Sequence, residues 1–94
     1  MFLLISKYIK PLSEVEKVLE AHRVFLSKYY ASGHFICSGR LNPRTGGCII
    51  CKAESKEDCC EILQEDPFVL HNISEYEIIE VQPTMYAEGF EKFI

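Results

Sequence analysis

The strand-forming segments of this chain carry apolar residues on both of their faces. Residues 2–9 are rich in β-forming residues and end just before Pro11. Successive side chains of a strand point to opposite faces. One face therefore receives Phe2 and Leu4, and the other receives Leu3, Ile5 and Ile9. Paired isoleucines at 49–50 and 78–79 repeat the pattern. A sheet built from these segments needs a cover on each face.

The order of the predicted elements indicates one fold class. In sequence they are a strand over 2–9, a helix from Ser13 to about Ser32, strands over 34–40 and 47–53, a helix from Ser55 to about Glu65, and a strand over 75–82. The order β-α-β-β-α-β is that of the ferredoxin-like fold, an α+β class with an antiparallel sheet and both helices on one face.

Local signals set the helix ends. Two capping boxes are predicted, Ser13 with Glu16 and Ser55 with Asp58. Gly33 supplies a left-handed stop after the first helix. The residue before a proline disfavours the helical region, so Asp66-Pro67 should break the second helix. The segment 41–47 is a loop by composition.

The helices can cover only one of the two apolar faces. The simplest second cover is the same sheet of another copy, packed face to face about a two-fold axis. We therefore expect a homodimer that associates through its sheet faces and not through its helices. The 94 residues should form one domain, with a ferredoxin-like core over about 1–83 and an apolar tail over 84–94.

Composition argues against several classes of function. The net charge is −4 and the ten basic residues are scattered, which disfavours a nucleic-acid partner. No segment reaches the length of a membrane span, and the N-terminus lacks the basic region of a signal peptide. We expect a cytoplasmic protein whose five cysteines are reduced thiols.

The sequence Cys48-Ile-Ile-Cys51 is not expected to bind a metal. Zinc sites place CxxC in a tight turn, whereas this pair lies in an apolar strand and should point to opposite faces. Cys59 and Cys60 are adjacent and do not supply a second pair at zinc spacing. No cofactor site is predicted either.

His22 lies within the apolar stripe of the first helix. Apolar residues recur at spacings of three and four around it: Val15, Val18, Leu19, Phe25, Leu26 and Tyr29. A histidine in such a stripe is either a core residue with a hydrogen-bond partner or the wall of a pocket. Both interpretations remain open at this level.

Several motifs together resemble the YCII-related (YciI-like) family. They are H-R-V-F-L, G-H-F-I-C-S-G-R, G-G-C-I-I, E-D-P-F and Y-E-I-I-E-V-Q-P, and they span roughly residues 1–83. The resemblance implies a dimeric α+β barrel. It also implies an active site with a His-Asp pair, here His22 and Asp66, beside a polar residue near Ser38. Many members carry proline where this chain has Arg40, which changes the shape and charge of the pocket.

The residue types support the same chemistry. Histidine accepts or donates a proton at neutral pH, and a carboxylate orients it and stabilises its charged form. We therefore predict His22 and Asp66 as catalytic residues, with Ser38, Gly39 and Arg40 binding a small-molecule substrate. Ser38 is a weak nucleophile candidate, because no sequence feature places it within reach of His22.

Two function classes follow from this pattern. The first is an enzyme of lyase, isomerase or hydrolase type that uses His22 as acid or base. The second is a non-catalytic dimeric binding or accessory module, in which His22 is a satisfied core residue and Asp66 only a turn former. The substrate is not identified by the sequence.

Overall fold

The predicted element order is confirmed, with two short additions. The computed structural model describes residues 1–94. The elements are β1 (Phe2–Tyr8), α1 (Leu12–Ala31), β2 (Phe35–Arg40), β3 (Gly46–Cys51), α2 (Lys56–Leu63), α3 (Pro67–Leu70), β4 (Ser74–Glu80) and the 3₁₀ helix η1 (Phe90–Phe93). The added elements are α3, which lies between the second predicted helix and the last strand, and η1, which lies in the C-terminal tail.

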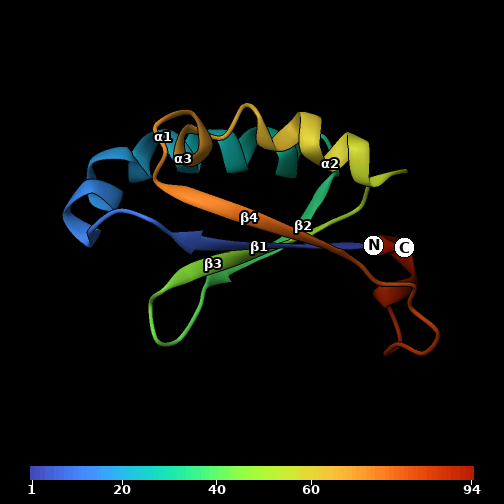
Figure 1. The fold of residues 1–94 in the computed structure, drawn as a ribbon. Coiled ribbons are helices and arrows are strands. Elements are labelled where there is room, and N and C mark those ends of the chain that lie inside the picture. The colour runs from blue at the N-terminus through green and yellow to red at the C-terminus, as the bar shows by residue number, and fades with distance from the viewer.

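The four strands form one antiparallel sheet in the order β2-β3-β1-β4. Helices α1, α2 and α3 all lie on the same face of this sheet (Figure 1). The opposite face carries no helix. The β2–β3 loop and the C-terminal tail project on that uncovered side, at the two ends of the sheet (Figure 1). The ferredoxin-like α+β architecture is thus confirmed.

The prediction of a capping box at Ser13 is wrong. Helix α1 already begins at Leu12, with Pro11 in the N-cap position and no side-chain cap. The carbonyl of Pro11 accepts from the amides of Glu14 and Val15 at 2.9 and 3.2 Å, so the first turn closes before Ser13 can cap it. Gly33 does adopt the expected left-handed conformation after the helix, with φ of +86°.

The second helical region divides into two helices. Ser55 caps α2 as predicted, since its side chain accepts from the amide of Asp58. However, α2 ends at Leu63 and not near Glu65. Asp66-Pro67 then opens a new helix, because the Asp66 side chain caps it and proline is well suited to a first turn. Asp66-Pro67, which was predicted to end a helix, therefore also begins the next one.

The core lies between the helical layer and the sheet. Its larger cluster consists of Phe2, Leu4, Phe25, Tyr29, Phe35, Ile49, Cys51, Cys59, Ile62 and Leu63. A smaller cluster, Val15, Phe68 and Ile73, packs beneath α3 with Tyr8, Val18 and Leu19 against it. The smaller cluster fixes α3 against the part of α1 from Val15 to Leu19, about one turn before His22.

A bulge in β2 changes which side chains face the helices. Phe35 pairs with Cys51 and Cys37 pairs with Ile50, so the register shifts by one residue between them. Ser38 then stands opposite Ile49, whose side chain is buried on the helical side. β-Bulges re-aim the side chains that follow them. As a result Ser38 and Arg40 face the helical layer, which strict alternation from the buried Phe35 would not allow.

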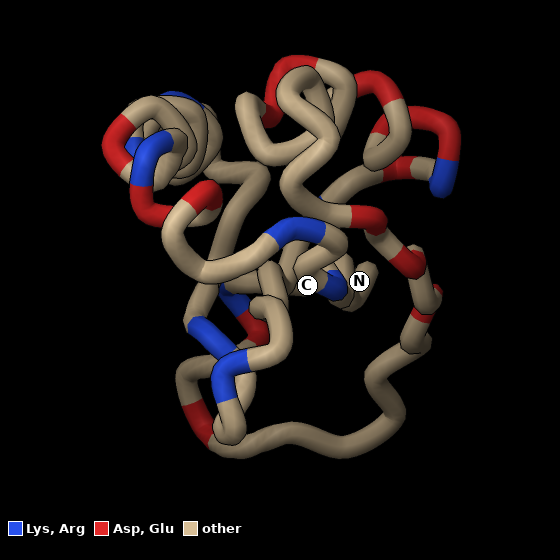
Figure 2. Tube along the Cα trace, turned by 60° about the vertical axis from the view of Figure 1, so that its left-hand side comes forward, with Lys and Arg blue, Asp and Glu red and all other residues tan.

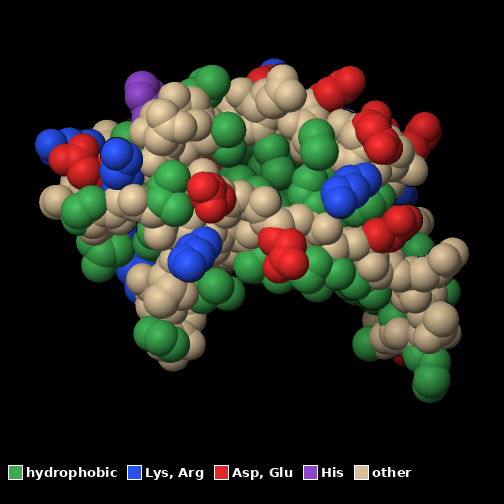
Figure 3. Space-filling model, viewed as in Figure 1, with side chains coloured by type: hydrophobic (Ala, Val, Ile, Leu, Met, Phe, Trp, Pro, Cys, Tyr) green, Lys and Arg blue, Asp and Glu red, His purple; other side chains and the backbone are tan.

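The uncovered face of the sheet is apolar along its middle. By register it presents Leu3, Ile5, Cys37, Cys48, Ile50 and Ile79. In the space-filling view, hydrophobic side chains gather along the hollowed underside between the two projections (Figure 3). Two-sided apolar strands are thus confirmed. No helix is both long and apolar enough to cross a membrane.

Gly46 and Gly47 lie where β3 closely approaches the backbone of β1 and of β2, respectively. A Cβ atom built on Gly46 would lie 1.8 Å from the carbonyl oxygen of Ser6. On Gly47 it would lie 2.9 Å from the carbonyl oxygen of Gly39. Backbone atoms cannot move aside as a flexible side chain can, so both positions require glycine.

We predict that Gly46→Ala lowers the free energy of unfolding by about 2–3 kcal/mol, because the added methyl group overlaps backbone. Urea denaturation measures this change. Gly39→Ala is the matched control, since a Cβ there meets nothing within 4 Å. It should change stability by less than about 0.5 kcal/mol. Equal effects of the two substitutions would contradict the packing described here.

Candidate active site

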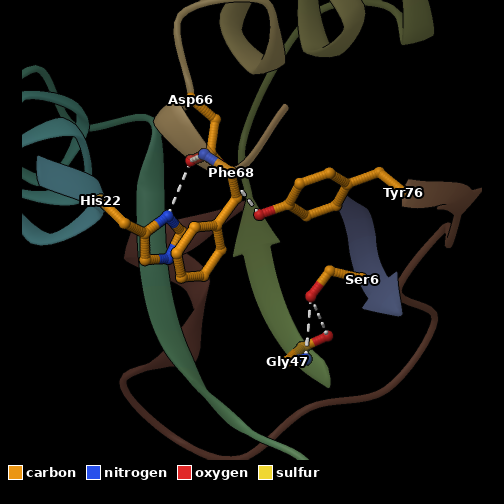
Figure 4. A network of polar contacts seen from close by, with 6 residues as sticks. All are labelled: Ser6, His22, Gly47, Asp66, Phe68 and Tyr76. Atoms are coloured by element: carbon orange, nitrogen blue, oxygen red, sulfur yellow. Dashed lines mark hydrogen bonds and ion pairs between the residues drawn. The ribbon is translucent and has the colours of Figure 1, made fainter. Parts of the chain in front are cut away.

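Asp66 is a fully buried carboxyl group that accepts three hydrogen bonds. Its side chain is 0% exposed. Oδ1 accepts from the backbone amide of Phe68 at 2.9 Å and lies 2.7 Å from Nδ1 of His22. Oδ2 accepts from the hydroxyl of Tyr76 at 2.7 Å. These partners come from α3, α1 and β4 respectively, and they converge on one side chain (Figure 4). The predicted contact between His22 and Asp66 is confirmed.

His22 is held between Asp66 and an aromatic ring. Its side chain is 12% exposed. The imidazole stacks on Phe68 with ring centroids 3.9 Å apart and an angle of 3° between the planes. Phe68 is the last residue of the E-D-P-F motif, two positions after Asp66. The motif therefore supplies the hydrogen bond and the stacking surface together.

The hydrogen-bond pattern assigns the proton on His22. Burial, reinforced by Asp66, raises the pKa of Tyr76, so its hydroxyl stays protonated and donates. The amide of Phe68 can only donate. Asp66 therefore accepts from both groups, and a carboxylate, which carries no proton, can bond to Nδ1 of His22 only as an acceptor. The neutral ring then carries its lone pair on Nε2, which has no hydrogen-bond partner within the chain.

A cavity of about 260 Å³ lies beside His22, between α1 and the sheet. All three predicted substrate-binding residues line it, namely Ser38, Gly39 and Arg40. The apolar part of its wall includes Leu19, Leu26, Ile49 and Phe68. The structure thus brings the predicted residues together, with Asp66 behind His22 and not in the wall.

Ser38 is not hydrogen bonded to His22. Its hydroxyl is 2.6 Å from that of Tyr30 on α1. A serine nucleophile needs a base within hydrogen-bond reach. The geometry therefore leaves Ser38 as a polar group of the cavity wall and provides no Ser-His pair.

Several residues of the site were missed in the sequence. Tyr76 was not singled out, although strand alternation places it on the same face as Ile78. Arg44 lies in a segment that was read only as a loop, yet it lines the cavity. Ser6 also lines it, and its hydroxyl oxygen accepts from the amide of Gly47 at 2.8 Å. Tyr8 lines the cavity as well.

The cysteines are separated by the sheet. Cys48 pairs with Ile5 on the uncovered face, and Cys51 pairs with Phe2 on the helical face. The predicted opposite orientation of the two thiols is confirmed. Burial raises the pKa of Cys51 to about 12 and also raises that of Cys59. No cluster of three or more histidine, cysteine or acidic side chains is arranged to hold a metal ion.

We predict that neutral His22 is the Nδ1–H tautomer. Nitrogen-15 NMR of the imidazole rings should show a protonated Nδ1 and an unprotonated Nε2 in His22. His71 is the control, because it is exposed at the end of α3 and has no carboxylate partner. It should show the Nε2–H form that free imidazole prefers. A His22 spectrum like that of His71 would contradict the assignment.

Comparison with known proteins identifies the fold and the family. The chain resembles the solved structure of 5-chloro-2-hydroxyhydroquinone dehydrochlorinase (TftG) from Burkholderia phenoliruptrix AC1100, in complex with 2,5-dihydroxybenzoquinone. The TM-score is 0.72 at 20% identity, over 87% of this chain and 94% of that one. No curated protein matches the chain. The YCII-related domain matches residues 1–82, and the chain therefore belongs to the YCII-related family.

Proposed function

We propose that this chain is a small-molecule enzyme in which His22 is the general acid–base group and Asp66 its orienting carboxylate. The observation that carries this proposal is the buried Asp66, which fixes Nδ1 of His22 and leaves Nε2 free beside the cavity. A histidine with a purely structural role is expected to have its ring nitrogens hydrogen bonded inside the core. It is not expected to present an unpartnered nitrogen to a cavity. The same geometry favours an enzyme over the alternative of a non-catalytic binding module.

Proton transfer at Nε2 is the step that this arrangement supports. Nε2 takes a proton from an acidic C–H or O–H bond of the substrate, and the imidazolium forms beside the ionised Asp66. In an elimination, the electron pair of the broken bond forms a new double bond and expels a leaving group. His22 then returns its proton to the leaving group or to water. Asp66 keeps its hydrogen bonds throughout.

Lyase or isomerase chemistry is favoured over hydrolysis through a serine. Ser38 is hydrogen bonded to Tyr30 and not to His22, so no activated nucleophile is available within the chain. The structurally similar protein TftG is named as a dehydrochlorinase, an enzyme that removes HCl. Its named substrate is therefore the first compound to assay, although the likeness at 20% identity concerns the fold.

We predict that His22→Ala lowers kcat by about 10²–10⁴-fold, because the proton acceptor is lost. The assay is chloride release from 5-chloro-2-hydroxyhydroquinone, followed by a panel of small acids with leaving groups. Asp66→Asn should lower kcat by at least about tenfold. The amide oxygen still accepts from Phe68 and His22 and the amide group can donate to Tyr76, so orientation is kept while the negative charge is lost.

Two controls separate catalysis from folding. His71→Ala removes an exposed histidine and should leave kcat unchanged. Tyr76→Phe removes one hydrogen bond to Asp66 but keeps the charge, so it should lower kcat less than Asp66→Asn does. Full turnover by His22→Ala would overturn the proposal. Ligand binding without turnover on any compound would favour the binding module.

We also propose that the uncovered sheet face is covered by a second copy of the chain. The face is apolar in its middle and hollowed between the β2–β3 loop and the tail (Figure 3). An apolar patch of this kind is unusual on a monomer. On the outer side of α1 the exposed Val24 stands among charged neighbours. The five free thiols fit a cytoplasmic location, which we propose as well.

We predict a particle of about twice the 10.8 kDa chain mass by sedimentation equilibrium at micromolar concentration. Ile50→Glu should dissociate it, because a carboxylate would be buried unpaired at the interface. Val24→Glu on α1 is the control and should leave the mass unchanged. Val24 is 66% exposed.

Alkylation with iodoacetamide gives an independent readout of the same interface. In a single chain both Cys37 and Cys60 are exposed. Cys37 lies on the uncovered face and should be protected in the dimer, whereas Cys60 on α2 should react. A monomeric mass, or equal labelling of the two thiols, would contradict the sheet-face dimer.

A further inference from the structure

The charge of the cavity is opposite to that of the whole chain. The chain has 14 acidic and ten basic residues, and acidic positions predominate around its outside (Figure 2). Yet the residues that line the cavity include three arginines, Arg23, Arg40 and Arg44, and no aspartate or glutamate. Positively charged groups beside apolar walls attract an anion more strongly than they would in open water.

Arg44 is positioned before any ligand arrives. Its Nη1 forms an ion pair with Oε1 of Glu16 on α1 at 2.8 Å, and its side chain is 26% exposed. The hydrogen bond to Glu16 raises the pKa of Arg44, so the guanidinium is charged throughout the accessible pH range. Its Nε is buried and has no hydrogen-bond partner. Because this atom is closed to solvent, it does not itself offer a contact to a ligand, and Arg44 contributes to the cavity through its charge.

Arg40 is directed to the same cavity by the bulge in β2. It stands opposite Gly47 in the register, on the helical side of the sheet. It forms no ion pair within the chain, whereas Arg23 contacts Glu20 at 3.6 Å and Arg44 contacts Glu16. The charge of Arg40 is therefore available to a ligand.

We propose that the cavity binds a small organic carboxylate, whose charged group lies against Arg40 and Arg44 and whose reactive part faces Nε2 of His22. Arginine is suited to this role because its planar N–H groups match the two oxygens of a carboxylate. The apolar wall of Leu19, Leu26 and Phe68 suits the carbon skeleton. The proposal names the substrate class of the site and rests on the proposed function for the role of His22.

The test uses benzoate and benzamide, which share their shape and differ in charge. Isothermal titration of the intact protein should give a Kd for benzoate at least about tenfold lower than that for benzamide. Arg40→Gln and Arg44→Gln should each raise the benzoate Kd about tenfold and leave the benzamide Kd unchanged. Lys17→Gln, which removes a remote charge on α1, should have no effect on either. Lys17 is 70% exposed and pairs with Glu14.

A charge-conserving variant, NMR shifts and a phosphate control complete the test. Arg44→Lys keeps the charge, so it should retain most of the benzoate affinity that Arg44→Gln loses. A loss caused by disturbed folding would instead appear in both variants. The amide resonances of Gly39 and Gly47 should shift with benzoate, which localises binding to the cavity. Equal affinities for benzoate and benzamide would overturn the proposal. Inorganic phosphate binding as tightly as benzoate would overturn the carboxylate assignment.

The two proposals fail in different ways. Arginine-dependent benzoate binding without turnover of any acid would leave the anion site standing and reject the acid–base function. His22-dependent turnover of a substrate, together with equal affinities for benzoate and benzamide, would reject the anion site and leave the function of His22 standing. His22→Ala should abolish turnover and change the benzoate Kd by less than about threefold.

Discussion

The buried carboxylate of Asp66 is the interaction on which the rest of this site depends. An ionised side chain removed from water is costly unless its oxygens are hydrogen bonded. Here three donors from three elements meet that need: the amide of Phe68 in α3, Nδ1 of His22 in α1 and the hydroxyl of Tyr76 in β4. Because each donor belongs to a different element, the carboxylate ties the helical layer to the sheet. It also settles which nitrogen of His22 is free.

The position of Asp66 depends in turn on its role as a helix cap. Its side chain closes the first turn of α3 through the amide of Phe68, and Pro67 prearranges that turn. Helix α3 is only four residues long, so it is held by packing and not by its own hydrogen bonds. Phe68 supplies that packing in the smaller core cluster and stacks on His22 at the same time. One short segment thus serves capping, packing and orientation.

The sheet separates the two surfaces on which the proposals rest. On the helical side the cavity contains the polar groups and the arginines, and on the other side the strands present a mostly apolar face. Residues of one strand serve both sides, as Cys48 and Cys51 illustrate on β3. A substitution on the uncovered face is therefore expected to affect assembly first, whereas one at Arg40 or His22 affects the cavity. This separation allows the two proposals to be tested with different variants.

Much of the fold and part of the site could be predicted from the sequence, because they follow from local patterns. Alternation within strands, the apolar stripe around His22 and the motif around Asp66 each depend on residues close together in the chain, and all three are present in the structure. Helix boundaries were less well predicted, since Pro11 starts α1 without the help of Ser13 and Asp66 both follows one helix and caps the next.

The remaining features were decided by the tertiary structure. Strict alternation from Phe35 would turn Ser38 and Arg40 away from the helices, and a one-residue bulge in β2 turns them back toward the cavity. Tyr76 reaches Asp66, and Arg44 reaches Glu16, only because the packed sheet brings those segments together. A periodic pattern predicts which face a residue shares with its near neighbours. It cannot predict a shift of register between strands or a contact across the core, because both are set by pairing between distant parts of the chain.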